Sequence, residues 1–487
     1  MYPRGPGPNI AAMTFADLAR ARSAEVWEHS IVPALHRYIA IPNVSAAFDA
    51  DWKANGYMDA AATLISAWCR DRPIPGLTVE VIELEGRSPM IVMEVPATSG
   101  VDGDDTVLMY GHLDKQPEMT GWREGLGPWT PVREGDRLYG RGGGDDGYSA
   151  FASLTSLEAL HAAGGAHARC IVLIEASEES GSPDLAAYVE HLADRIGTPS
   201  LVICLDSGCA DYERMWVTTS LRGLVALHLT VEVLENGLHS GDVSGIVPSS
   251  FRILRQLLDR VEDASTGRIL VDALHTSIPP DRLRETHATA AALGGRPSDE
   301  YRFAGTTEPM SSDAIDQFLQ RTWRPTLSYI SADGFPPSSR AGNVLRPSTT
   351  LGLSFRLPPT VDADEARDTL MALLSADPPS GATVVVAGTE AASGWNAPEF
   401  APWLTASLTQ ASQATFGRPF LTEGEGGSIP FMGMLGQRFP HAQFVITGVL
   451  GPESNAHGPN EYLHLPTAER ITAALAMVIN DHASRPS

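Results

Sequence analysis

Residues 106–114 read TVLMYGHLD, an apolar run that becomes abruptly polar at its end. Two later stretches repeat this pattern, CIVLIEASEE at 170–179 and LVICLDSG at 201–208. Uninterrupted apolar runs are typical of strands buried inside a parallel sheet. Ligands of open α/β sheets gather beyond the carboxyl ends of the strands. We therefore expect the three strand ends to bring their polar residues to one rim: His112, Asp114, Glu178, Glu179 and Asp206.

The segments around these runs alternate between strand-like and helix-like patterns. Apolar residues recur at helical spacing over about 14–40, 52–69 and 149–163. Such alternation predicts an α/β domain with a largely parallel central sheet flanked by helices.

From about residue 222 the pattern changes. LVALHLTVEV at 224–233 alternates with a period of two, as a half-exposed strand does. The order strand, helix, strand, strand, helix, strand then predicts a small α+β sandwich inserted into the first domain. We expect the α/β domain over 14–220 and 391–487 and the inserted domain over 221–390. We expect the segment at about 264–320, rich in Ala, Thr and Pro, to be irregular.

Composition excludes several classes of function. The net charge is −24, whereas nucleic acids and anionic lipids require concentrated Lys and Arg. The four cysteines form no CxxC pair or disulfide framework. No apolar stretch reaches the roughly 18–20 residues that span a bilayer. The N-terminal stretch MYPRGPGPNIAAMTF, residues 1–15, predicts a flexible Pro/Gly-rich tail without the apolar region of a signal peptide. These features favour the reducing cytoplasm.

Five short clusters carry the residues suited to chemistry. They are GHLD at 111–114, GRGGGDD at 140–146, EASEES at 175–180, LDSG at 205–208 and AHGPNE at 456–461. Together they supply two histidines and several carboxylates, which are ligands that a divalent metal such as zinc accepts. Two such ions held about 3.5–4 Å apart need a shared carboxylate.

Each cluster alone has a simpler interpretation. His112 alone would be a turn histidine, two adjacent glutamates usually form a solvated face, and His457 alone would be an ordinary loop residue. GRGGG is followed by no Lys-Ser/Thr pair, so it is not a phosphate-binding loop. Its glycines more simply let the backbone approach a site closely. The five clusters in this order are hard to explain by chance.

These motifs carry a family resemblance. GHxDxxP at 111–117, GLHSG at 237–241 and GEGGSIP at 424–430 join the five clusters. The set resembles the dinuclear zinc metallopeptidase family of carnosinase, cytosolic nonspecific dipeptidase, carboxypeptidase G, acetylornithine deacetylase and succinyl-diaminopimelate desuccinylase. It is most similar to the dipeptidase branch, and the likeness extends from about residue 30 to the end.

The resemblance implies a role for each site residue. His112 and Asp206 would bind one metal, Glu179 and His457 the other, and Asp145 would bridge both. Asp114 would orient the ring of His112. In the family the peptide bond between the two aspartates, here Asp145–Asp146, is cis. Hydrolysis of the amide bond of a dipeptide or short peptide would use a hydroxide that bridges the metals, with Glu178 as general base.

The resemblance also implies how substrate is held. His239 would donate to the oxyanion, reaching in from the lid domain of the partner subunit in a homodimer, so the inserted domain would be a lid and dimerisation domain. Arg356 would pair with the substrate's carboxylate. The other expected substrate-binding residues are Asn343, Glu425, Gly426 and Ser428.

One departure from the family pattern stands beside the metal ligands. Relatives commonly have DDKG where this chain has Asp145-Asp146-Gly147-Tyr148. The missing lysine makes a subfamily with different substrates plausible. Two other functions stay open: a deacylase of N-acylated amino acids that uses the same metals, and a non-catalytic binding protein on the same fold. Zinc is the expected metal, although manganese and cobalt accept the same ligands.

Overall fold

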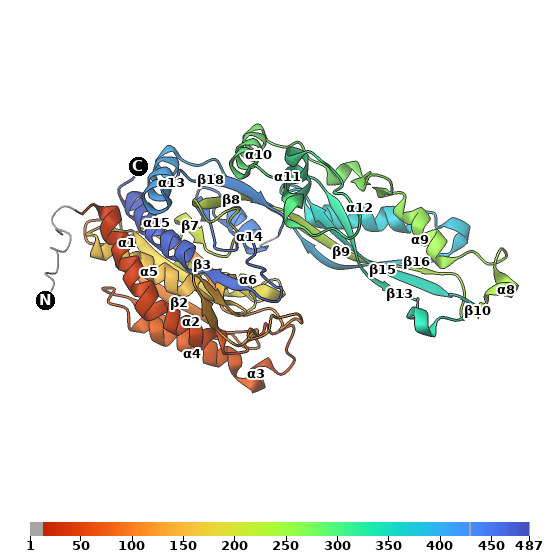
Figure 1. The fold of residues 1–487 in the computed structure, drawn as a ribbon, viewed down its shortest axis with the longest axis horizontal. Helices are drawn as coiled ribbons and strands as arrows, with labels where there is room; N and C mark the ends of the chain where they lie inside the picture. The colour runs from red at the N-terminus through yellow and green to blue at the C-terminus, as the bar shows by residue number, and fades with distance from the viewer. Residues whose placement is uncertain (1–12, 428–429, 487) are drawn as a thin grey trace. The chain divides into compact units, whose positions relative to one another are not determined.

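The computed structural model describes residues 13–427 and 430–486. The chain divides into two compact units (Figure 1). The first contains the chain up to Thr218, Pro398–Thr422 and Leu435 onwards, and the second contains Thr219–Ala397 and Glu423–Met434. Residues 1–12 of the predicted tail lie outside the described residues. Glu423–Met434, which the sequence placed in the α/β domain, belongs to the second unit because the backbone there contacts Arg222, which donates to the carbonyl of Gly426 over 3.1 Å.

The central sheet of the first unit has the strand order β1-β2-β6-β3-β7-β19-β8. Its four middle strands, β6, β3, β7 and β19, run parallel, and β1, β2 and β8 pair antiparallel at the two sides. This sheet confirms the predicted α/β class. The bounds are β1 Thr78–Ile82, β2 Met90–Val95, β3 Thr106–His112, β6 Arg169–Glu175, β7 Pro199–Cys204, β8 Trp216–Leu221 and β19 Gln443–Ile446.

Helices flank this sheet, and three of them, α1, α5 and α15, pack on one another (Figure 1). Thr14 begins α1 with a reciprocal capping box, because its hydroxyl accepts from the amide of Asp17 and the Asp17 carboxylate accepts from the amide of Thr14. The helices are α1 Phe15–Val26, α2 Val32–Ile39, α3 Trp52–Asn55, α4 Tyr57–Arg70, α5 Ser149–Ala162, α6 Leu185–His191, α7 Ala193–Ile196, α13 Pro402–Phe416, α14 Pro430–Arg438 and α15 Leu465–Ala483. Among the described residues, none of the helices is both long and apolar enough to cross a membrane.

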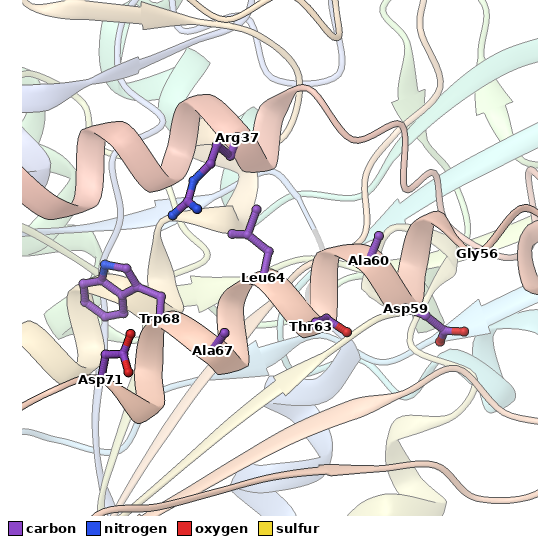
Figure 2. Close-up of a pocket in the computed structure, with 9 residues that line it drawn as sticks. All are labelled: Arg37, Gly56, Asp59, Ala60, Thr63, Leu64, Ala67, Trp68 and Asp71. Carbon is purple, nitrogen blue, oxygen red and sulfur yellow. The ribbon is translucent and has the colours of Figure 1, made fainter.

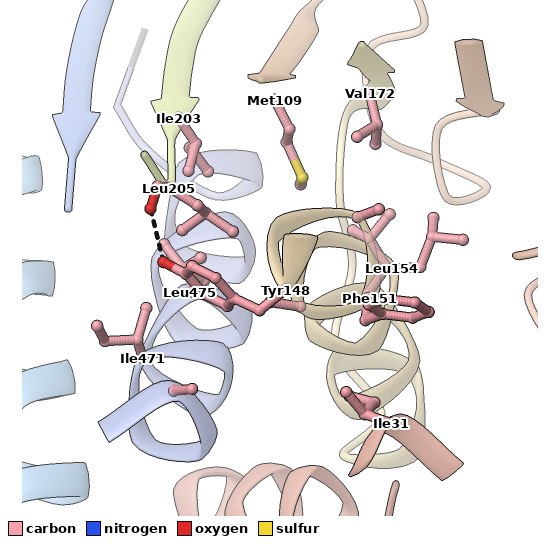
Figure 3. Packing of buried hydrophobic residues seen from close by; sticks show 14 of the residues in the cluster. Ile31, Met109, Tyr148, Phe151, Leu154, Val172, Ile203, Leu205, Ile471 and Leu475 are labelled. Carbon is pink, nitrogen blue, oxygen red and sulfur yellow. Dashed lines mark hydrogen bonds between the residues drawn. The ribbon is translucent and has the colours of Figure 1, made fainter. Parts of the chain in front are cut away.

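The core of the first unit lies between the sheet and α5, whose first twelve residues are all buried. Phe151 and Leu154 of this helix lie under Met109 and Val172 of the sheet (Figure 3). The hydroxyl of Tyr148, which precedes α5, donates to the carbonyl of Leu205 over 2.6 Å (Figure 3). This packing fixes the start of α5, and with it the Gly-rich loop before it, against the end of β7.

A small second sheet brings two distant motifs together. Its order is β20-β5-β4, with β4 Val132–Glu134, β5 Arg137–Tyr139 and β20 Tyr462–His464. GRGGGDD directly follows β5, and AHGPNE directly precedes β20. Because Tyr462 pairs with Tyr139 across these strands, loops more than 300 residues apart in the chain meet at one place.

The second unit contains a four-stranded antiparallel sheet in the order β13-β15-β9-β16. Helices α9 and α12 pack on it around a separate apolar core (Figure 1). The bounds are β9 Gly223–Glu232, β13 Thr326–Asp333, β15 Ser348–Leu357, β16 Thr383–Ala392, α9 Ser250–Leu258 and α12 Ala363–Ser375. Its shorter elements are β10 Leu238–His239, α8 Ser240–Val243, β11 Glu262–Asp263, β12 Arg268–Ile269, β14 Val344–Leu345 and β17 Trp395–Asn396, and β18 Leu421–Glu425 enters it from the first unit.

The prediction of an irregular segment at 264–320 was wrong in part. The segment contains α10, Pro280–Leu293, and most of α11, Ala314–Thr322. The buried positions of α10 are polar: Arg282, Glu285, Thr286 and Thr289. A search for apolar periodicity misses a helix whose buried face is built from charged and hydroxyl side chains.

Candidate metal centre

Three adjacent strands of the first unit deliver the polar residues to one rim. In the parallel register, His112 at the end of β3 lies opposite Glu175 at the end of β6, and Tyr110 lies opposite Cys204 at the end of β7. Glu178 and Glu179 follow β6, and Asp206 follows β7. The structure therefore brings these strand ends together, as parallel pairing requires.

The side chains form two groups that share one aspartate. In the first group, Nε2 of His112 lies 3.4 Å from Oδ1 of Asp145 and 3.7 Å from Oδ1 of Asp206. In the second, Nε2 of His457 lies 3.0 Å from Oδ2 of Asp145 and 3.1 Å from Oε2 of Glu179. Each group offers three ligand atoms within 4.8 Å of one another. The two oxygens of Asp145 thus face different histidines, which is the arrangement of a bridging carboxylate.

The donor set fits divalent cations. Nε2 of His112 and Oε1 of Glu179 are buried and have no hydrogen-bond partner among the described residues. Buried polar atoms without a partner are costly, and a cation in each of the two groups would satisfy one of these atoms. Imidazole nitrogen and carboxylate oxygen are ligands for zinc, manganese and cobalt alike.

Asp114 contacts residues of both groups. Its Oδ1 lies 3.4 Å from Nδ1 of His112, so it faces the ring nitrogen turned away from the metal groups. Its two oxygens also accept from the amides of Glu178 and Glu179, over 3.1 and 3.0 Å. One buried carboxylate therefore orients a histidine of one group and the peptide that carries a glutamate of the other.

Gln116 is a residue of this site that sequence reasoning missed. Its side-chain amide donates to Oε2 of Glu179 over 2.9 Å. The available signal was its position inside the GHxDxxP motif, two residues after Asp114.

The Asp145–Asp146 peptide bond is cis, as the resemblance implied. Asp146 belongs to neither metal group, and its Oδ2 accepts from the amide of His112 over 3.1 Å. Gly111 permits this approach, because a Cβ there would lie 2.6 Å from Oδ2 of Asp146 and 2.1 Å from Oγ of Ser149.

A buried ion pair holds the two loops of the second group together. The Arg141 guanidinium contacts the Glu461 carboxylate, and both side chains are almost wholly buried. Arg141 also donates to the carbonyl of Gly458 over 3.0 Å, and the amide of Gly142 donates to Glu461 over 2.7 Å. The pair thus links the loop that carries Asp145 to the loop that carries His457.

The electrostatics of the site favour bound positive charge. Burial opposes ionisation of Asp145, but the imidazoles of His112 and His457, which face its two oxygens, hold the pKa of its carboxyl below the usual value. Burial lowers the pKa of His457, but hydrogen bonds to Asp145 and Glu179 raise it by more than burial lowers it. The resulting pKa is about 11. Burial, reinforced by the charge of Asp206, raises the pKa of Glu178 well above its usual value. Carboxylates that stabilise a protonated histidine this strongly would stabilise a metal cation in the same way.

The remaining predicted site residues lie in the second unit, except Ser428, which is outside the described residues. His239 and Asn343 are neighbours there, because the amide of Ser240 donates to the carbonyl of Asn343 over 2.9 Å. Both are exposed, and Nδ1 of His239 lies 3.7 Å from Oδ2 of Asp242.

Arg356, Glu425 and Gly426 occupy another part of the second unit. Arg356 is half-buried on β15, and burial lowers the pKa of its guanidinium. Arg222, which sequence reasoning missed, is buried and contacts the carbonyl of Gly426. Burial and the charges of Arg356 and Arg321 lower the pKa of Arg222 to about 10. Arg222 and Arg321 both lie against Gly426, because a Cβ there would meet Arg321 at 3.1 Å and Arg222 at 3.2 Å.

A surface groove of about 670 Å³ lies elsewhere in the first unit, along α4 (Figure 2). Arg37, Asp59, Thr63, Trp68 and Asp71 are among the side chains that line it. It includes none of the predicted site residues, so it is separate from the metal groups.

Residues 108–481 match the family described as peptidase family M20/M25/M40. The chain belongs to this family. It is therefore a metallopeptidase, as the sequence predicted, and the family implies divalent metal ions at the centre. The resemblance stated from the motifs is confirmed.

Individual relatives agree with this assignment. The chain is 27% identical over 378 residues to a cysteinylglycine-S-conjugate dipeptidase of Corynebacterium striatum, covering 76% of this chain and 80% of the relative. It is 29% identical over 255 residues to the human Beta-Ala-His dipeptidase, covering 51% of this chain and only half of that relative. The fold is similar to that of the di-peptidase Dug1p of Saccharomyces cerevisiae, with a TM-score of 0.76, 20% identity, and coverage of 98% of this chain and 100% of the other.

Proposed function

We propose that this metallopeptidase is a dipeptidase with a dinuclear metal centre. The observation that carries the proposal is Asp145, whose two carboxylate oxygens face His112 and His457 from a single side chain. His112 and Asp206 would hold one ion and Glu179 and His457 the other, with Asp145 shared. The curated relatives named above are dipeptidases, which supports a dipeptide as the substrate.

Bound divalent cations would polarise the scissile carbonyl and make a water molecule easier to deprotonate. The chain itself would supply the proton transfer. Glu178 precedes a ligand candidate, and Asp114 holds the amides of both glutamates. The two glutamates would have different roles. Glu179 would bind a metal, and Glu178 would take the proton from water and later deliver it to the leaving amine.

The second unit would select the substrate. Arg356 would pair with the substrate's carboxylate, and the backbone at Gly426, with Ser428, would assist it. Glu425 would face the free amino group, and Asn343 would lie beside His239, the oxyanion donor. The two arginines that lie against Gly426, Arg222 and Arg321, support an anionic substrate group at this place.

We further propose a homodimer formed through the second unit, with His239 acting on the partner's centre. His239 is exposed within its own unit. Strand β13 lies at the edge of its sheet and exposes Tyr329 and Ile330, and Phe335 follows it, also exposed. An exposed apolar sheet edge is a common site of association.

We also propose that the metal is zinc and that the enzyme is cytoplasmic. The two His-carboxylate groups suit zinc. All four cysteines are buried, and none of them forms a disulfide in the described part of the chain, which is consistent with a reducing compartment.

The test uses metal-stripped protein with unblocked dipeptides and their N-acetyl analogues, with and without added zinc or manganese. Metal-dependent cleavage of the free dipeptides alone is the expected result. Cleavage of the acylated compounds alone would make the protein a deacylase and contradict the dipeptidase proposal. Two bound metals without turnover of either compound would also contradict it.

A further inference from the structure

Lysine is nearly absent from this chain. Lys and Arg number 35 together, and only two of them are lysines, Lys53 and Lys115. Lys53 is about half exposed and pairs with Glu83 at the surface. Lys115 is wholly buried, directly after Asp114 in the motif that carries His112. All the other Lys and Arg positions are arginine, and the second lysine is next in sequence to Asp114, which contacts His112.

The ammonium of Lys115 caps the end of a helix. Nζ donates to the carbonyl of Tyr38 over 2.9 Å and to the carbonyl of Ile41 over 2.8 Å. It also lies 4.0 Å from the centre of the Tyr38 ring. Helix α2 ends at Ile39, so Nζ binds one carbonyl in its last turn and one just beyond it, where a cation interacts favourably with the helix dipole. The Tyr38 carbonyl also accepts from the amide of Ile41 over 3.0 Å. A compact ammonium can direct donors to two such carbonyls and still face the ring.

Two glycines make room for this arrangement. A Cβ on Gly142 would lie 2.6 Å from both Cγ and Cε of Lys115, so the lysine stem lies directly against that backbone. A Cβ on Gly147 would lie 2.1 Å from Cε1 of Tyr38. Tyr38 therefore closes the position after the two aspartates, where the family pattern has lysine. The buried lysine at this place is instead Lys115, which belongs to the loop that follows β3.

The contacts around Lys115 fix the segment that leaves β3. The Tyr38 hydroxyl and the Asn43 side-chain amide both donate to the carbonyl of Leu113, over 2.7 and 2.6 Å. The amide of Ser45 donates to the carbonyl of Lys115 over 2.9 Å. The Lys115 side chain in turn donates to the carbonyls of Tyr38 and Ile41 at the end of α2. Leu113 and Lys115 flank Asp114, so these bonds position the residue that orients His112.

The same side chain lies near the ion pair that joins the other two loops. Burial lowers the pKa of Lys115 well below its usual value, the Glu461 carboxylate raises it, and the Arg141 guanidinium lowers it. The Lys115 stem lies against Gly142, so it contacts the loop that carries Arg141 and Asp145.

We propose that Lys115 is a positioning residue for the metal centre, and that it takes over from the neighbouring loop the place of the lysine missing after Asp146. It holds the His112–Asp114 segment against α2 and the glycine loop against that segment. It contacts neither substrate nor metal. The inference rests on the proposed function, because the centre it positions is the one assigned there.

The test compares Lys115→Met with Lys53→Met in the full-length protein. Methionine keeps most of the length of the stem and removes the ammonium. The first readout is the Zn²⁺ affinity of metal-stripped protein, measured by competition with a chromophoric chelator. We expect a loss of about 10–100-fold for Lys115→Met, the range found when groups that orient metal ligands are removed, and a change of less than about twofold for Lys53→Met. The second readout is dipeptide hydrolysis at saturating Zn²⁺, where kcat should fall by a similar factor while KM changes little.

Lys115→Arg separates charge from geometry and carries the test if Lys115→Met does not fold. The planar guanidinium keeps the charge but is too large for the closed space against Gly142, so Zn²⁺ affinity should fall here too. Folded Lys115→Met or Lys115→Arg protein with wild-type Zn²⁺ affinity and kcat would overturn the proposal. If the wild-type protein cleaves no dipeptide, the dipeptidase assignment fails, and the Zn²⁺ measurement still decides the role of Lys115.

Discussion

His482, near the end of α15, should make the first unit sensitive to acid. Its side chain is wholly buried, and Nε2 lies 2.8 Å from the hydroxyl of Ser200 and 3.7 Å from Oδ2 of Asp105. Burial and the positive charge of Arg485 lower its pKa to about 4, against the attraction of Asp105. The folded protein therefore holds this imidazole neutral at pH values where an exposed histidine is already protonated.

The magnitude follows from proton linkage. The ordinary pKa is 6.5, and the folded value is about 4. Between these values the unfolded chain binds more protons, so stability falls as the pH falls. From pH 7 to pH 5 the loss from this one group is about 2 kcal/mol at 1.36 kcal/mol per pKa unit. For a unit of this size the loss corresponds to roughly 5 °C in the melting temperature.

The assay is thermal unfolding of metal-free protein at pH 7 and pH 5, which removes the effect of acid on metal binding. His482→Gln keeps a polar side chain beside Ser200 and cannot titrate, so the decrease in Tm between the two pH values should be smaller than in the wild type by roughly 5 °C. His191→Gln, at an exposed histidine, controls for the substitution. If His482→Gln loses as much Tm on acidification as the wild type, the argument from burial is wrong.

Three further substitutions test the metal centre and its surroundings. Glu178→Gln should lower kcat by about 10²–10⁴-fold, the usual contribution of a general base, while the Zn²⁺ content of dialysed protein stays at the wild-type value; loss of metal would instead make Glu178 a ligand. Asp145→Asn should weaken both ions together, so that a Zn²⁺ titration shows no site of wild-type affinity; one unchanged site would contradict a shared carboxylate. Gly147→Ala should cost about 3 kcal/mol of stability in urea denaturation, because its Cβ would overlap the Tyr38 ring. Gly103→Ala, where nothing lies within 4 Å of the added Cβ, should change stability by less than about 0.5 kcal/mol.

Much of the architecture could be predicted from local sequence. Strands β3 and β6 are apolar runs that end in His112 and Glu175, and β7 is followed by Asp206. The parallel sheet places these ends at one rim. The rule works because neighbouring parallel strands have their carboxyl ends on the same side. The whole-chain motif set then indicated the family before any contact was known.

Helix α10 could not be predicted from the local sequence. Its buried residues bond to partners distant in sequence, as when Arg282 donates to the carbonyl of Ala397 over 2.8 Å. Glu285 accepts from the hydroxyl of Thr219 over 2.5 Å. A buried polar face gives no apolar period to detect, since its stability comes from hydrogen bonds whose partners the local sequence does not reveal.

Sequence alone determined the α/β class, the family and the set of residues suited to bind metal. Each of these depends on local patterning or on short motifs. Only the tertiary structure decided that the two oxygens of Asp145 face different histidines, that Gln116 contacts Glu179, and that Tyr38 leaves no room for a side chain at Gly147. The physical reason is that these features are distances of a few ångströms between residues far apart in the chain. Close packing sets such distances when distant segments fold onto one another, and no periodicity within a segment encodes them.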